Sequence, residues 1–277
     1  MRFIRKTIRV INKFRRKSLL VSDQNLIVDA ASISNKISVW LGSQIHEKIS
    51  FGEYCITSSY LKKTNNKTNT YPYDWIFSSP EIVLHSIKND FDSFLDKDQI
   101  YQLDKKRAGH SLYHSRMFNH KSPLKSEMNY DYYVRAVNRL KDVLKNQTNC
   151  VFVITVINES ENKLNWTNGF DKKIKQPINQ SLETFKPLVS YIKEVNPNSK
   201  FLFISQYTHK HQLSLKTTSV NNFNKNPYIN LSYMNESIAW IDFMSIGSIS
   251  GTKYRNKIDD MVARIVYQGL NNKAETT

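Results

Sequence analysis

Cysteine and glycine are both scarce in this sequence. Its 277 residues include 2 cysteines, Cys55 and Cys150, and 7 glycines. Two cysteines provide no disulfide framework, which fits a reducing compartment or a periplasmic protein that does not depend on a bridge. The few glycines form neither a Gly-x-Gly-x-x-Gly sequence nor a Walker loop, so the sequence argues against a loop that cradles nucleotide phosphates.

Long hydrophobic runs are also missing. The longest apolar runs, such as residues 151–157, are far shorter than the ~20 residues that a membrane-spanning helix needs. We expect no secretory signal, because nothing after the basic start resembles the apolar h-region of a signal peptide. The expected location is therefore cytoplasmic. Hydrophobic residues make up 40% of the chain, which is ample for a folded core.

Acidic residues are too few to balance the basic ones. The sequence has 40 Lys and Arg against 24 Asp and Glu, and eight of these cations lie within residues 2–17, where no acid accompanies them. Five apolar side chains of this segment share one helical face: Phe3, Ile4, Ile8, Ile11 and Phe14. We expect residues 1–20 to form a basic amphipathic helix that binds an anionic surface peripherally, at the inner face of the membrane. A solvated helix and a nucleic-acid arm are the alternatives, and no motif supports a specific nucleic acid partner.

The rest of the chain alternates between strand and helix patterns. Residues 151–157 are apolar and rich in β-branched side chains, which is typical of a strand buried on both faces of a parallel sheet. Other strands are expected at residues 200–205 and 238–242, and helices at residues 80–95, 133–144, 182–195 and 254–268. The pattern predicts an α/β fold, a three-layer sandwich with a mostly parallel central sheet, in a single catalytic domain over residues 21–277. Residues 18–47 are harder to interpret: within them, residues 30–41 could form a strand or a short helix, and this choice stays open.

The stretch around Cys55 is the strongest candidate for a functional site. Ile49 and Phe51 have the spacing of the inward face of a strand, which we expect to be central in the sheet. Gly52 permits a tight turn, and residues 57–63 are expected to form a helix. Cys55 therefore falls at a strand-to-helix junction, where a helix N-terminus lowers the pKa of a thiol and favours the thiolate. The alternative is a cysteine that belongs only to the core.

Motifs downstream of Cys55 follow in a recognisable order. They are Tyr71-Pro72-Tyr73-Asp74-Trp75-Ile76, Ser78-Ser79-Pro80, Asn89-Asp90-Phe91 and Met117-Phe118-Asn119-His120. Together with the Gly-x-x-Cys turn, this order over about residues 48–157 resembles a bacterial family of uncharacterised papain-like cysteine peptidases. The turn alone resembles, less closely, capsule polysaccharide-biosynthesis acetyltransferases, in which an Asn usually precedes the Cys. The papain label implies a helical half and a β-barrel half, whereas the sequence pattern favours a parallel sheet.

The first resemblance implies a cysteine–histidine active site. Cys55 is then the nucleophile and His120 the base, with His114 as the alternative base. An imidazole in this position removes the thiol proton and stabilises the thiolate. Backbone support for an oxyanion would come from the turn at Gly52 and from the N–H groups of Cys55 and Ile56.

A third group should orient the imidazole. Asp74 is the first candidate and Asp242, at the end of the expected last strand, is the second. A structural role for Asp74 stays open, either in capping a turn or in holding Arg135 or Arg139. A metal site is a weaker possibility, because the histidine pairs at positions 110 and 114 and at positions 209 and 211 lack an accompanying motif, and we expect no metal.

Three classes of function follow from these residues. The first is a hydrolase or peptidase that acts on a peptide or glycan substrate through a thioester at Cys55 and requires no cofactor. The second is an O-acyltransferase that modifies cell-surface or capsular polysaccharide, with acyl-CoA as the donor. The third is a non-catalytic binding or scaffold protein in which Cys55 is a core residue.

Overall fold

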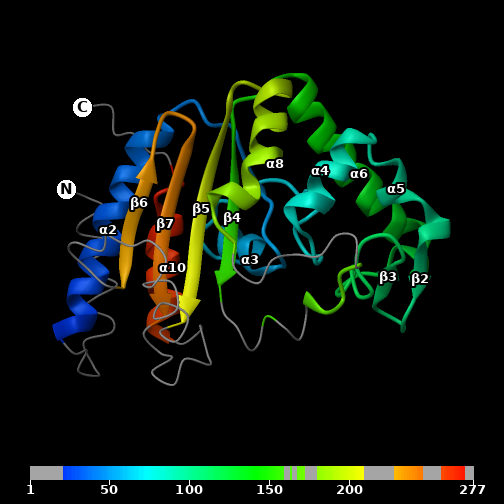
Figure 1. Cartoon of the computed structure of the whole chain (residues 1–277), viewed down its shortest axis with the longest axis horizontal. Coiled ribbons are helices and arrows are strands. Elements are labelled where there is room, and N and C mark those ends of the chain that lie inside the picture. The colour runs from blue at the N-terminus through cyan, green and yellow to red at the C-terminus, as the bar shows by residue number, and fades with distance from the viewer. Residues whose placement is uncertain are drawn as a thin grey trace.

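A five-stranded sheet forms the middle of the structure (Figure 1). The computed structural model describes residues 21–158, 163, 167–171, 180–208, 228–245 and 257–271, so the helix predicted for residues 1–20 lies outside them. In spatial order the strands are β1 (Glu47–Ser50), β4 (Cys150–Asn158), β5 (Ser199–Thr208), β7 (Ile238–Ser245) and β6 (Ile229–Met234). The first four are parallel, and β6 pairs antiparallel with β7 at the edge. This arrangement confirms the mostly parallel sheet.

Helices cover both faces of this sheet, as Figure 1 shows. One face carries α4 (Pro80–Lys88), α6 (Glu127–Lys145) and α8 (Leu182–Val195), and the other carries α2 (Val21–Leu41), α3 (Ile56–Lys63) and α10 (Lys257–Gln268). Neighbouring residues of a strand point to opposite faces, so Phe152 packs in the first layer and Val151 in the second. The three-layer α/β sandwich predicted from the sequence is confirmed.

A small hairpin stands apart from the main sheet. It pairs β2 (Ile100–Gln102) with β3 (Ala108–His110) in antiparallel fashion. Two short 3-10 helices flank it: η1 (Lys97–Gln99) and η2 (Pro123–Lys125). β3 ends at His110, and the segment that follows it contains His114 and His120.

The helix expected over residues 80–95 is divided in two. α4 ends at Lys88, and a short helix, α5 (Asp92–Leu95), follows it. Asp90 and Phe91 between them have positive φ angles of 54° and 66°. Aspartate tolerates this left-handed conformation, and the turn places the Phe91 ring in the core, where it is 1% exposed. Helical periodicity continues through this turn in the sequence, which is why the prediction was wrong there.

The segment left undecided contains a long helix. Buried side chains recur every three or four residues along α2: Leu26, Ala30, Ile33, Ile37 and Leu41. This stripe packs against α10, and a Cβ atom at Gly269 would lie 2.4 Å from the Ser34 carbonyl oxygen.

The sequence pattern did not predict the edge strand β6. Within the described ranges, no helix has both the length and the apolar character needed to cross a membrane.

Candidate active site around Cys55

The strand, turn and helix around Cys55 form as the sequence predicts. β1 ends at Ser50, and its pairing continues one residue further, where the Phe51 N–H donates to the Val153 carbonyl oxygen at 3.0 Å. Cys55 is the N-cap residue of α3 and is partly exposed. Contrary to our expectation of a central strand, β1 is the outermost strand of the sheet. Cys55 therefore lies beyond the carboxyl end of a parallel edge strand, the end at which α/β proteins commonly bind ligands.

Gly52 is needed for space and not for an unusual φ angle. A Cβ atom at this position would lie 2.2 Å from Thr57 Oγ1. Thr57 is fully buried, and its hydroxyl oxygen accepts a hydrogen bond from the Thr155 N–H of β4 at 3.1 Å. The only positive φ angle among the described glycines is that of Gly42. Gly52 thus lets the first turn of α3 dock directly on the neighbouring strand.

A buried ion pair lies directly beside the Cys55 turn. Lys163 Nζ contacts Glu53 Oε1 at 2.8 Å, and the two side chains are 0% and 2% exposed. The second carboxylate oxygen of Glu53 accepts the Ile157 N–H at 3.1 Å. Burial raises the pKa of the Glu53 carboxyl, and Lys163 opposes that rise. Our reading of the sequence missed this pair, because Lys163 lies in a polar stretch with no periodicity to indicate burial.

Cys150 has a very different environment from Cys55. It opens β4, is 0% exposed, and its Sγ lies 3.6 Å from Ser199 Oγ and 3.7 Å from Asn196 Nδ2. Burial raises the pKa of the Cys150 thiol to about 12. A buried thiol of this kind stays protonated near neutral pH and is a poor nucleophile.

His120 is exposed and lies against the aromatic motif. Its ring meets the half-buried Trp75 ring edge-on, with 6.4 Å between ring centroids. The segment that follows Trp75 also contacts the Cys55 turn, since Ser78 donates from its N–H to the Glu53 carbonyl oxygen and from Oγ to the Gly52 carbonyl oxygen. Residues 75–78 therefore connect the His120 side of the molecule to the Cys55 side. The pairing of Cys55 with His120 stays a prediction.

His114, the alternative base, is buried among aromatic rings. It stacks on Phe77 at a centroid distance of 4.7 Å and meets Phe170 edge-on at 4.5 Å. Its Nδ1 accepts the Arg116 N–H at 2.9 Å, which places the proton of the neutral ring on Nε2. A Cβ atom at Gly169 would lie 2.5 Å from that Nε2. These contacts fix the orientation of the ring tightly.

Asp74 holds the turn before Trp75. One carboxylate oxygen forms an ion pair with Lys67 and accepts the Tyr71 N–H at 2.8 Å. The side chain is buried, and burial raises the pKa of the Asp74 carboxyl, whereas Lys67 and the Ser58 hydroxyl of α3 oppose the rise. Arg139 contacts the same loop, because its guanidinium donates to the Thr70 carbonyl oxygen at 2.9 Å. These contacts support the structural role of Asp74 that the sequence left open.

Asp242 lies three strands away from β1. It accepts hydrogen bonds from the Ser232 hydroxyl and, at 2.9 Å, from Trp240 Nε1. Burial raises the pKa of its carboxyl, and these two partners and Ser205 oppose the rise. Trp240 belongs to the core layer on the face that carries α8, whereas α3 covers the opposite face of the sheet. The contacts of Asp242 thus run across β5, β6 and β7.

The side chains of His110 and His114 make separate contacts. His110 Nε2 lies 2.9 Å from the Ser93 carbonyl oxygen, and burial lowers the pKa of this imidazole. The part of the chain that the structure describes contains no group of three potential metal ligands. His209 and His211 lie outside that part.

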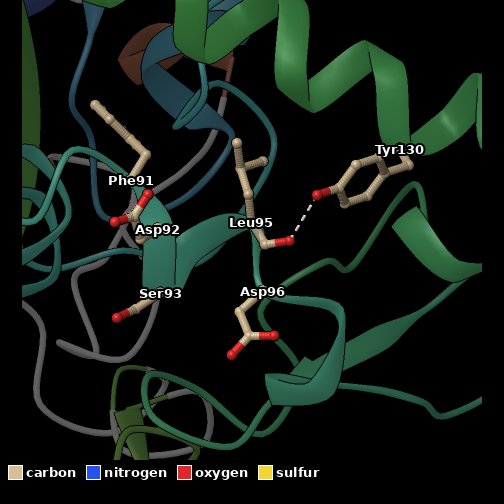
Figure 2. Close-up of a pocket in the computed structure, with 6 residues that line it drawn as sticks. All are labelled: Phe91, Asp92, Ser93, Leu95, Asp96 and Tyr130. Carbon is tan, nitrogen blue, oxygen red and sulfur yellow. Dashed lines mark hydrogen bonds between the residues drawn. The ribbon is translucent and has the colours of Figure 1, made fainter.

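Two clefts lie away from Cys55. The first, of about 500 Å³, is shown in Figure 2 and lies at α5 and the start of α6, where the Tyr130 hydroxyl donates to the Leu95 carbonyl oxygen at 2.8 Å. The second, of about 390 Å³, lies between α4, α6 and α8. Phe91 lines both clefts, and neither Cys55 nor His120 lines either one.

Comparisons with known proteins identify the family. A family model matches residues 46–225, well over half of the chain, and this range contains Cys55, Asp74, His120 and Lys163 but not Asp242. A search of curated proteins and a search of solved structures found no match. The matched range begins one residue before β1 and includes β4 and β5. The chain belongs to the family described as "Putative papain-like cysteine peptidase (DUF1796)".

Proposed function

We propose that this protein is a cysteine-dependent acyl-transfer enzyme in which Cys55 is the nucleophile. The observation that carries the proposal is the position of Cys55: a partly exposed thiol at the N-cap of α3, beyond the carboxyl end of β1. A helix N-terminus favours the thiolate, and its backbone N–H groups can bind a developing oxyanion. The family description supports the class of chemistry.

The reaction would proceed through a thioester. His120 takes the proton of the Cys55 thiol, and the sulfur attacks the carbonyl carbon of the substrate, forming a C–S bond. The N–H groups of Cys55 and Ile56 bind the oxyanion, and the proton then passes from His120 to the leaving amine or alcohol, or to the leaving thiol when acyl-CoA is the donor. In the second half, His120 removes a proton from water or from an acceptor hydroxyl, and the activated oxygen attacks the thioester carbon. The C–S bond breaks, and the proton on His120 returns to the Cys55 sulfur.

Cys–His chemistry of the papain kind does not require the papain fold. The sheet beside Cys55 is parallel in four of its five strands and is covered by helices on both faces. The same Cys–His chemistry occurs on unrelated folds, because it depends on the local geometry of a few groups. His120 is the preferred base, since its exposed ring can approach a substrate, whereas His114 is enclosed by Phe77 and Phe170.

An intact-mass experiment tests the proposal. The full chain, Cys55→Ala and Cys150→Ala are each incubated with activated ester substrates, acylated peptides, acylated glycans and acyl-CoA. We expect an added acyl mass on the full chain and on Cys150→Ala, and none on Cys55→Ala. An adduct that decays in water identifies a hydrolase, and one that persists until a glycan is added identifies an O-acyltransferase. If Cys55→Ala carries as much acyl group as the full chain, Cys55 is not the nucleophile.

A further inference from the structure

The Glu53–Lys163 ion pair joins three separate parts of the chain. Glu53 belongs to the turn between β1 and α3, Ile157 lies near the end of β4, and Lys163 and Gln180 follow β4 in sequence. Lys163 Nζ donates to Glu53 Oε1 at 2.8 Å, to the Ile157 carbonyl oxygen at 2.7 Å, and to Gln180 Oε1 at 3.4 Å. Glu53 in turn accepts the Ile157 N–H at 3.1 Å. One lysine ammonium group thus links the turn to the carboxyl end of β4.

Burying two charges at this point requires a physical reason. Removing a carboxylate and an ammonium group from water costs several kcal/mol each, and apolar residues of similar volume often serve stability equally well. What a hydrogen-bonded ion pair adds is geometry, because its donors and acceptors fix the distances between the segments that carry them.

The nearest chemically reactive group along the chain is the Cys55 thiol. Glu53 precedes it by two residues, and the Glu53 backbone is also held on its other side, where its carbonyl oxygen accepts the Ser78 N–H at 3.0 Å. The Glu53 side chain is thereby fixed to β4 and its main chain to the segment that follows Trp75. Cys55 is attached to this doubly held residue by a single intervening residue, Tyr54.

We propose that Glu53 and Lys163 are positioning residues for Cys55: their buried ion pair fixes the β1–α3 turn so that the thiol stays at the N-terminus of α3. The inference rests on the proposed function of Cys55. It assigns no contact with substrate to either residue, since both side chains are buried. Their effect is on the orientation of the thiol relative to the N–H groups that favour the thiolate.

The test removes both charges together. In the Glu53→Leu/Lys163→Met variant neither charge is left unpaired, which avoids the large penalty of a lone buried charge. A matched control is Lys97→Met/Glu127→Gln, which removes the exposed Lys97–Glu127 pair of 3.2 Å from a distant surface. Both variants are made in a Cys150→Ala background for labelling of Cys55, and in the full chain for hydrogen exchange.

Two measurements separate positioning from stability. Hydrogen exchange of the peptide that covers residues 52–57 should become faster in the double variant, whereas exchange in β4 and β5 should stay slow. The rate of Cys55 alkylation at about pH 7 should fall by about tenfold, the effect of raising a thiol pKa by roughly one unit. The control variant should match the full chain in both measurements.

Other results overturn the inference. A folded double variant with unchanged alkylation of Cys55 shows that the pair does not position the thiol, whatever its exchange pattern. If the double variant does not fold, Lys163→Arg is used instead, since it keeps the charge and changes the geometry; unchanged alkylation there also overturns the inference. Failure of the proposed function is visible separately, as a full chain that forms no acyl adduct on Cys55.

Discussion

Gly52 lies so close to Thr57 that a Cβ atom on residue 52 would stand 2.2 Å from the Thr57 hydroxyl oxygen. The hydroxyl cannot move away freely, because it accepts a hydrogen bond from the Thr155 N–H of β4. The turn that carries Cys55 is therefore packed against the neighbouring strand with no room for a side chain at residue 52. This contact and the Glu53–Lys163 pair hold the turn at two successive residues.

Gly52→Ala should destabilise the protein through this contact. We expect a loss of about 1–3 kcal/mol in the free energy of unfolding, the usual cost of overpacking, together with slower alkylation of Cys55. Urea unfolding and labelling kinetics check the two effects. Gly42→Ala is the control: its φ of 71° costs about 1–2 kcal/mol, but no atom lies within 4 Å of the added Cβ, so Cys55 should react as before. A Gly52→Ala variant as stable as the full chain would contradict the packing argument.

The two cysteines should differ in reactivity. In a Cys150→Ala variant, Cys55 should react with iodoacetamide at about pH 7, because it is partly exposed at a helix N-terminus. In a Cys55→Ala variant, Cys150 should react slowly until the protein is unfolded, because burial raises the pKa of its thiol to about 12. Labelling rates measured against pH test this difference. Equal rates in the folded state would favour the reading of Cys55 as a core residue.

Cys150 should also make stability depend on pH in the alkaline range. Its pKa is raised from 9.0 to about 12 in the folded protein, so the unfolded chain loses the thiol proton first. Stability from this group is fully present below about pH 9 and is lost as pH rises toward 12, at about 1.4 kcal/mol per pH unit. The difference in unfolding free energy between the full chain and Cys150→Ala should therefore shrink by about 1.4 kcal/mol for each pH unit above about pH 9. A constant difference from about pH 8 to 11 would refute the assignment.

His120 should prove to be a functional residue and His114 a structural one. His120→Ala removes an exposed ring, so we expect a change in stability of about 0.5 kcal/mol or less and a loss of about 10²–10⁴-fold in acyl transfer. His114→Ala removes a buried ring between Phe77 and Phe170 and should cost about 3–5 kcal/mol. Thermal unfolding and adduct formation are measured for both variants. Full activity in His120→Ala would contradict the role of His120 as the base and would favour His114 instead.

The Asp74–Lys67 pair should behave as a structural unit. Asp74→Ala leaves the Lys67 ammonium without its partner and the Tyr71 N–H without its acceptor, so we expect a loss of about 3–5 kcal/mol. The double variant Asp74→Leu/Lys67→Met should lose much less, because it buries no lone charge. Unfolding free energies in a double-mutant cycle give the coupling. If Asp74→Asn instead abolished acyl transfer at unchanged stability, Asp74 would act as the group that orients the imidazole.

The sequence by itself determined the elements with strong local patterns. The buried strand after Cys150 and the helix of residues 182–195 follow from apolar periodicity, and the Cys55 junction follows from a strand pattern that meets a helix start. Local propensity and periodicity suffice here, because each element shows one consistent pattern over many residues. The family resemblance was likewise carried by short motifs that are visible in the sequence, and the family match includes them.

Only the tertiary structure decided what lies beside Cys55. The burial of Lys163 against Glu53 depends on contacts between residues 110 positions apart, and no local pattern encodes such a contact. The position of β1 at the sheet edge and the break before Phe91 are decided in the same way, by packing of the segment against other parts of the fold. Local sequence determines which elements form, whereas burial and charge pairing determine which of their side chains meet.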